Sequence, residues 1–85
     1  MQETVMQIPE RLNARWIDSI SDAQLVSAED QLHTEFATYE RAEKQRRGSR
    51  YELLRGPTTL VNAWLRWLLV SNATRSRGLL AIRGH

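Results

Sequence analysis

The chain has 85 residues, no cysteine, 26% charged residues and a formal net charge of +2 at pH 7. This length predicts one domain over residues 1–85 with a small core, because a domain of this size buries only roughly 60–65% of the surface that its unfolded chain exposes. The absence of cysteine excludes a disulfide framework and a thiolate zinc site, and the two histidines are too far apart in sequence to indicate a metal site. Oligomerisation remains as a way to enlarge the core.

The small net charge conceals a division between the two halves of the chain. Residues 1–40 contain eight acidic side chains and two arginines, whereas residues 41–85 contain ten basic and two acidic side chains. This division favours attraction between the halves, within one molecule or across a dimer, or a basic end that faces an anionic partner. Solvated helix faces explain the same charges without a partner.

A first helix is expected over residues 9–20, where Pro9 suits the first helical turn and apolar residues recur at the spacing of one helical face. This apolar stripe consists of Leu12, Trp16, Ile17 and Ile20. Residues 1–7 show no sustained period and are expected to be flexible or to dock on a partner. They are polar and lack the apolar segment of a signal peptide, which predicts a cytoplasmic protein.

A second, longer helix is expected over residues 21–47, with Ser21 as its N-cap and Gln24 completing a capping box. Its apolar residues are spaced by three or four, as in a seam that packs against another helix. This seam consists of Leu25, Ala28, Leu32, Phe36 and Tyr39. We expect a break or a kink at Gly48, because glycine commonly terminates helices.

The densest apolar stretch predicts a third helix over residues 58–73, capped by Thr58. Nine of the eleven residues from Leu60 to Val70 are apolar. The stretch from Thr58 to Ser71 is roughly 21 Å long as a helix, too short for a hydrocarbon core of about 30 Å, which favours a buried helix of a soluble domain. Its expected main face contains Leu60, Val61, Trp64, Trp67, Leu68 and Ser71.

Two further leucines, Leu65 and Leu69, widen the apolar surface of this helix beyond what one neighbouring helix covers. We expect the remainder to be buried between two copies or against another protein. Arg66 is expected to pair with an acidic residue of the second helix. The sequence as a whole therefore predicts an all-α domain of three main helices that forms a homodimer.

A basic C-terminal tail, residues 76–85, is expected to be flexible or docked on a partner. Its apolar group consists of Leu79, Leu80, Ala81 and Ile82. These residues are expected to form a short extended segment that docks on the domain or on a partner, or else a frayed tail.

No catalytic, cofactor or metal motif occurs, so we expect a protein that is not an enzyme and needs no cofactor or small-molecule substrate. His33 lies on the second helix and His85 at the last position, which does not indicate a Ser-His-Asp or Cys-His arrangement. His33 is expected to be a solvated or interfacial side chain.

The preferred hypothesis is a small helical adaptor or regulator that binds a copy of itself and another protein. Its candidate partner-binding residues are Trp64, Trp67, Leu68, Phe36 and Tyr39. A membrane partner is not expected, because the apolar helix and the arginine clusters are separated in sequence instead of sharing one amphipathic helix.

The alternative hypothesis is a nucleic-acid-binding regulator that contacts phosphates through two basic clusters, with Tyr51 as a stacking group. The first cluster consists of Lys44, Arg46, Arg47, Arg50 and Arg55, and the second of Arg75, Arg77 and Arg83. No helix-turn-helix spacing accompanies these residues, and dipole complementation at helix ends explains them equally well.

Overall fold

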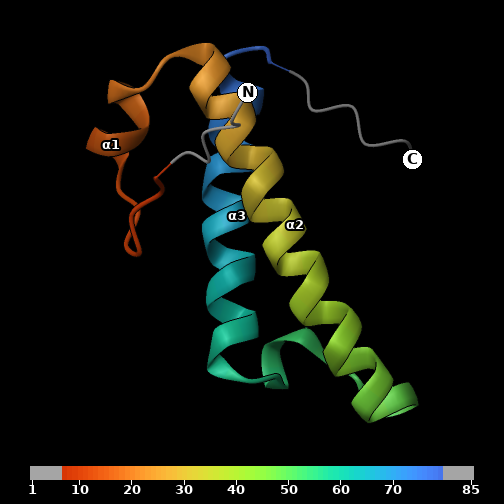
Figure 1. Cartoon of the computed structure of the whole chain (residues 1–85). Coiled ribbons are helices and arrows are strands. Elements are labelled where there is room, and N and C mark those ends of the chain that lie inside the picture. The colour runs from red at the N-terminus through yellow and green to blue at the C-terminus, as the bar shows by residue number, and fades with distance from the viewer. Residues whose placement is uncertain (1–6, 80–85) are drawn as a thin grey trace, which may run out of the picture.

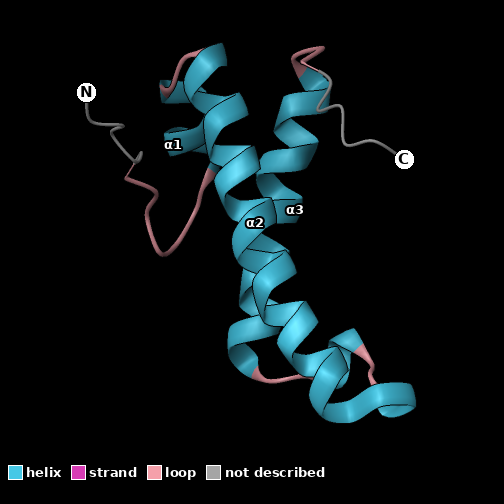
Figure 2. Ribbon diagram, turned by 45° about the vertical axis from the view of Figure 1, so that its right-hand side comes forward, coloured by secondary structure: helices cyan, strands magenta, loops and turns pink. Residues whose placement is uncertain are grey.

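The computed structural model describes residues 7–79, which form three α-helices and two short 3₁₀ helices and contain no strand. The two long helices, α2 (Asp22–Arg47) and α3 (Thr58–Ser76), are the antiparallel arms of a hairpin, and the short α1 (Ala14–Ser19) lies beside the end where α2 begins and α3 ends (Figure 1). The chain turns between the arms through η1 (Gly48–Arg50) and η2 (Leu53–Arg55) (Figure 2). The expected all-α fold is confirmed.

The start and the end of α2 follow local signals in the sequence. The Ser21 hydroxyl accepts from the Gln24 backbone N–H at 3.1 Å, and the Gln24 side chain accepts from the Ser21 backbone N–H at 2.9 Å. This capping box satisfies two backbone donors that the helix leaves free. At the other end, Gly48 has φ of 59°, a value that glycine adopts readily. The predicted cap and the predicted break are both confirmed.

The first helix is shorter than the expected range of residues 9–20. The Asn13 side chain accepts from the Trp16 backbone N–H at 2.8 Å, so that α1 begins only after Asn13. Residues 7–12 are not helical, and the Pro9 carbonyl accepts from Arg66 Nη2 of α3 at 2.9 Å. A side-chain cap and a contact with a distant helix therefore override the apolar period that suggested a longer helix.

The bounds of α3 differ slightly from the expected residues 58–73. Pro57, and not Thr58, occupies the N-cap position, and no side chain caps this end. The helix continues to Ser76, beyond the predicted end, and the buried Thr74 hydroxyl donates to the Val70 carbonyl at 2.7 Å within this last part. Thr74 is polar, but this bond satisfies its hydroxyl and lets the final turn remain packed.

The core lies between α2 and α3 in two adjoining clusters. The cluster nearer α1 consists of Ile17, Leu25, Ala28, Leu32 and Val70, and the cluster nearer the turn consists of Phe36, Leu60 and Ala63. Trp67 packs against both clusters and joins them. The predicted seam of α2 is buried from Leu25 to Phe36, whereas Tyr39 is 42% exposed.

The buried face of α3 differs from the face that the sequence suggested. Ala63, Val70 and Thr74 are buried, whereas Val61 and Leu68 are only half-buried. Because nine of the eleven residues from Leu60 to Val70 are apolar, this part of α3 contains no clear period that determines which side turns inward. Leu60 and Ser71 of the expected face are buried as well, and Leu65 and Leu69 are the large apolar side chains of α3 that remain exposed.

Arg77 connects the end of α3 to α1 through hydrogen bonds. Its guanidinium donates to the backbone carbonyls of Ile17 at 2.7 Å and Ile20 at 3.1 Å, and to Asp22 Oδ1 at 2.9 Å. Leu79 packs against the first core cluster. Residues 76–79, which the sequence assigned to a flexible or partner-docked end, thus contact the domain itself, while the rest of that tail and residues 1–6 lie outside the described residues.

Candidate interaction surface

Trp67 is held inside the hairpin by three neighbouring side chains. Its indole N–H donates to Glu29 Oε2 at 2.7 Å, and Glu29 is itself buried. The Phe36 ring stacks on the indole with centroids 5.7 Å apart, and the His33 ring meets it edge-on at 5.2 Å. Two of the candidate partner-binding residues, Trp67 and Phe36, therefore contact each other in the core.

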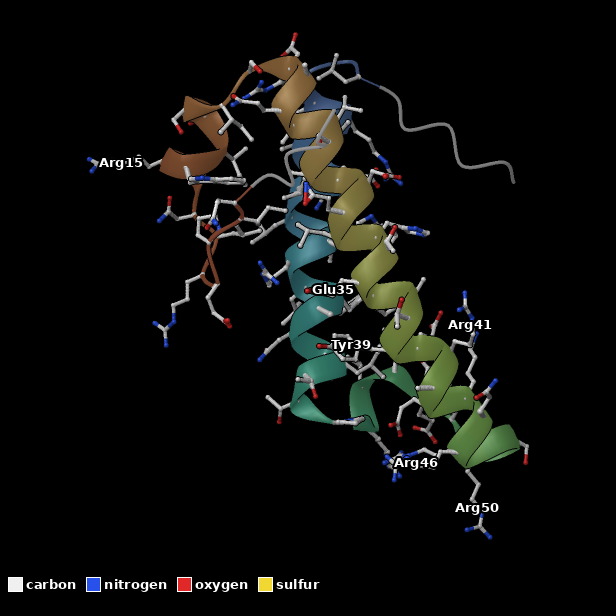
Figure 3. The ribbon with its side chains drawn as sticks, in the orientation of Figure 1. Arg15, Glu35, Tyr39, Arg41, Arg46 and Arg50 are labelled. Carbon is white, nitrogen blue, oxygen red and sulfur yellow. The ribbon has the colours of Figure 1, made fainter. Side chains whose placement is uncertain are left out.

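The other candidate partner-binding residues lie nearer the surface. Trp64 is half-buried and packs against the Phe36 cluster, and Leu68 is half-buried one helical turn further along α3. Tyr39 lies on α2, and its side chain extends toward α3 one turn after Glu35 (Figure 3). The structure thus gathers Phe36, Trp64 and Trp67 in one cluster and leaves Leu68 and Tyr39 outside it.

The side of α3 that faces away from α2 is apolar and largely uncovered. Leu65 and Leu69 lie one turn apart and are 45% and 46% exposed. Arg66 is the only charged residue of α3 before Arg75. We call this side the outward face, and it consists of Val61, Leu65, Leu68, Leu69 and Asn72. Its exposed leucines are the apolar remainder that the composition of α3 suggested.

A second 3-4 repeat runs along the outward face. Its six positions are Thr58, Val61, Leu65, Leu68, Asn72 and Arg75, separated by steps of three, four, three, four and three residues. All six are exposed or half-buried. This spacing is that of the a and d positions of a coiled coil, and the apolar part of the outward seam consists of Val61, Leu65 and Leu68, with polar residues at both of its ends. The repeat could have been read from the sequence, but the apolar density of the helix obscured it.

An open cavity of about 600 Å³ borders the outward face and lies between residues 10–12, α2 and α3. Leu12, Tyr39, Leu65 and Leu69 contribute to its lining. Arg66 lines it too and donates to Glu35 at 3.0 Å, which confirms the expected pairing of Arg66 with an acidic residue of the second helix. The rest of the lining is partly polar and includes Glu10, Arg11, Thr59 and Asn62, so a partner that reaches into this cavity meets a mixed surface and a cation whose charge Glu35 balances.

The first basic cluster lies at the hairpin tip, which we define as residues 40–55. Most of its cations have carboxylate partners within the tip itself. Lys44 lies 3.7 Å from Glu40, Arg46 and Arg47 both lie 2.8 Å from the buried Glu43, and Arg55 lies 3.4 Å from Glu52. Within residues 7–79, no carboxylate lies within ion-pair distance of Arg41 or Arg50, both of which project from the hairpin (Figure 3).

Tyr51 is also engaged within the hairpin tip. Its hydroxyl donates to Glu40 Oε2 at 2.9 Å, and the Lys44 ammonium lies 5.4 Å from the centre of its ring. Partial burial raises the pKa of Tyr51 to about 12, with contributions from the Glu40 hydrogen bond and from the charges of Glu40 and Glu43. The side chain that the sequence offered as a stacking group therefore already has two partners.

The second basic cluster lies at the opposite end of the hairpin. Arg55 precedes α3 and Arg75 lies in its last turn, so the helix from Thr58 to Arg75 separates them by roughly 26 Å, which exceeds a Debye length of about 8 Å at physiological salt. Arg75 is exposed, Arg77 binds the α1 carbonyls, and Arg83 lies outside the described residues. The structure therefore does not unite the two clusters into one basic surface.

Comparison of the chain with protein-family models, with curated proteins and with solved structures gives no match in any of the three. Across residues 7–79, no group of His, Cys, Asp or Glu side chains has an arrangement that suits a metal ion. The same part of the chain contains no helix with the length and apolar character needed to span a bilayer. The outward face and the hairpin tip are thus the surfaces from which a function is inferred.

Proposed function

We propose that the protein is a small non-enzymatic helical adaptor or regulator that binds a helix of a partner, including that of a second copy, along the outward face of α3. The exposed Leu65 and Leu69, in a stretch with a single charged residue, support this proposal most directly. Contiguous apolar surface of this kind marks interaction sites, and a 3-4 repeat suits a helical partner. Leu68 belongs to this surface and Trp64 borders it, while Trp67 and Phe36 pack between α3 and α2.

The expected complex is weak and reversible. Complete burial of a leucine side chain contributes roughly 1.5–3 kcal/mol, and the half-exposed Leu65 and Leu69 gain about half of that each. Two copies then gain an apolar contribution close to the lower end of the association cost, which is about 4–15 kcal/mol. Additional contacts from the half-buried Val61 and Leu68 bring the net free energy of association to about −4 to −6 kcal/mol, a dissociation constant between about 1 mM and tens of micromolar, which suits a regulated interaction more than a permanent one.

The experiment compares three proteins by size-exclusion chromatography over a range of concentrations: the unmodified chain, the double variant Leu65→Gln with Leu69→Gln, and Leu54→Gln. Leu54 is 73% exposed at the hairpin tip and so provides a matched control. We expect the double variant to remain monomeric and Leu54→Gln to associate like the unmodified chain, with equal helicity in all three. Equal association of all three proteins would exclude the outward face as the binding surface.

A second candidate function is phosphate binding at the hairpin tip, and the local charge favours it. The tip contains six basic and three acidic residues, and Arg41 and Arg50 are its cations without an ion-pair partner within residues 7–79. Two available cations correspond to a slope of about −2 in a plot of log binding constant against log salt concentration. A duplex titration should show this slope, and Arg41→Ala with Arg50→Ala should abolish binding. A complete lack of binding at low salt would rule this function out.

A further inference from the structure

We propose that the occupant of the outward face is α3 of a second copy, packed antiparallel, with Leu65 opposite Leu68 of the partner subunit. This inference rests on the proposed function and specifies its partner, orientation and register. In an antiparallel helix pair, each a position of one helix faces a d position of the other. A two-fold axis between Arg66 and Trp67 relates all six seam positions to one another in this way.

The register follows from the length of the outward seam. It runs from Thr58 to Arg75, roughly 26 Å along the helix. With the axis at its midpoint, Thr58 faces the partner subunit's Arg75 and Val61 faces the partner subunit's Asn72. A shift by one heptad leaves two seam positions of each helix without a counterpart. The centred register is therefore the one in which all six seam positions of both copies have a counterpart.

The orientation follows from charge. In a parallel pair, Arg75 faces Arg75 of the partner subunit, and two hairpin tips with six basic and three acidic residues each lie at the same end of the dimer. In an antiparallel pair, each tip lies at the same end of the dimer as residues 14–30 of the partner subunit, which contain four acidic residues and one basic residue. Arg75 and Arg77 share that end, so its total charge is small, and the antiparallel pair mainly removes the repulsion between two positive tips.

Asn72, unlike the charged residues, favours the parallel pair. There, two Asn72 side chains face each other and gain a hydrogen bond of about 0.5–1.5 kcal/mol. The antiparallel pair forgoes this bond but places the amide near the exposed end of the seam, where water satisfies it. The like charges at Arg75 and across two whole tips outweigh one such bond at low ionic strength, and antiparallel alignment of the helix dipoles adds to the difference.

Disulfide trapping distinguishes the two orientations, because the chain contains no cysteine of its own. Two single variants, Val61→Cys and Asn72→Cys, are mixed in equal amounts at low salt in a glutathione redox buffer and analysed by mass spectrometry. Seam positions that face each other lie within the Cα separation of about 4.4–6.8 Å that a disulfide requires. We expect the disulfide between the two different variants to exceed either homodimeric disulfide several-fold. Val26→Cys, at a position of α2 that is 45% exposed, measures random collision.

Each other outcome overturns a defined part of the proposal. Predominant homodimeric disulfides would establish a parallel pair, which overturns the orientation and leaves the proposed function intact. If the two variants form no more disulfide than Val26→Cys does, in a chain that still dimerises, the interface lies elsewhere. The same result in a chain that stays monomeric would exclude the second copy as the occupant, and only a different protein partner on the outward face would then remain.

Discussion

Trp67 combines two roles at the level of a single side chain, because it joins both core clusters and donates to the buried Glu29. Trp67→Phe keeps an aromatic ring against Phe36 but removes one donor of a buried carboxylate. Loss of such a partner costs roughly 1–3 kcal/mol. We expect the free energy of unfolding to fall by this amount in urea denaturation followed by circular dichroism. Trp64→Phe is the control, and an equal loss in both variants would show that the Glu29 contact contributes little.

Tyr51 makes the hairpin tip sensitive to alkaline pH. Its pKa is raised from 10.0 to about 12, mainly by burial, so the folded chain keeps the hydroxyl proton where an unfolded chain loses it. This contribution to stability is therefore complete below pH 10 and is lost as the pH rises toward 12.

Absorbance titration of tyrosinate in the Tyr39→Phe variant isolates this ionisation, because the chain contains only two tyrosines. We expect a midpoint near pH 12, and a lower midpoint when Glu40→Gln removes the neighbouring charge. A midpoint at the ordinary tyrosine value in the folded protein would contradict the hydrogen-bonded arrangement of the tip.

At the level of elements, the three helices differ in how far local residues predict them. Ser21, Gln24 and Gly48 act on their own neighbours, so both ends of α2 were predicted from the sequence. The length of α1 depends on the Asn13 cap and on a bond from Arg66 to the Pro9 carbonyl, and the latter joins residues far apart in sequence. Such a contact leaves no periodic signal, so the expected helix over residues 9–20 was too long.

The candidate surface was predictable in composition but not in orientation. Leu65 and Leu69 were recognised as more apolar surface than one neighbour covers, and the structure leaves both half-exposed. Trp67 and Phe36 were offered as partner-binding residues because large aromatic side chains serve cores and interfaces alike. The rotation of α3 about its axis, which depends on packing against α2, assigns Trp67 to the core, whereas Phe36 belongs to the seam of α2 that the sequence predicts to pack against another helix.

Asn72 provides a prediction about the outward seam as an element. Asn72→Leu extends its apolar run and removes a polar group from the proposed interface, so association should strengthen roughly tenfold, equivalent to about 1.4 kcal/mol. Dilution experiments by analytical ultracentrifugation measure this change. Gln45→Leu, which adds a leucine at an exposed position of α2, should leave association unchanged. An unaltered dissociation constant for Asn72→Leu would indicate that Asn72 lies outside the contact.

For the whole molecule, Arg77 determines whether α1 stays attached to the hairpin. Its guanidinium binds two α1-end carbonyls and Asp22, and hydrogen bonds to charged groups contribute about 1.5–3 kcal/mol each. We expect Arg77→Ala to accelerate amide hydrogen exchange in α1 while the middle of α2 stays protected. Arg75→Ala, which removes an exposed arginine two residues earlier, should leave exchange unchanged. Similar exchange in both variants would show that apolar packing alone holds α1.

The central claim is that the outward face of α3 is covered by a second copy in solution. Sedimentation equilibrium of the unmodified chain tests it most directly, because the method needs no substitution and reports mass alone. We predict a mass that rises from 9.9 kDa toward twice that value as the concentration rises from tens of micromolar into the millimolar range. A mass that stays at 9.9 kDa up to the highest soluble concentration would contradict the claim.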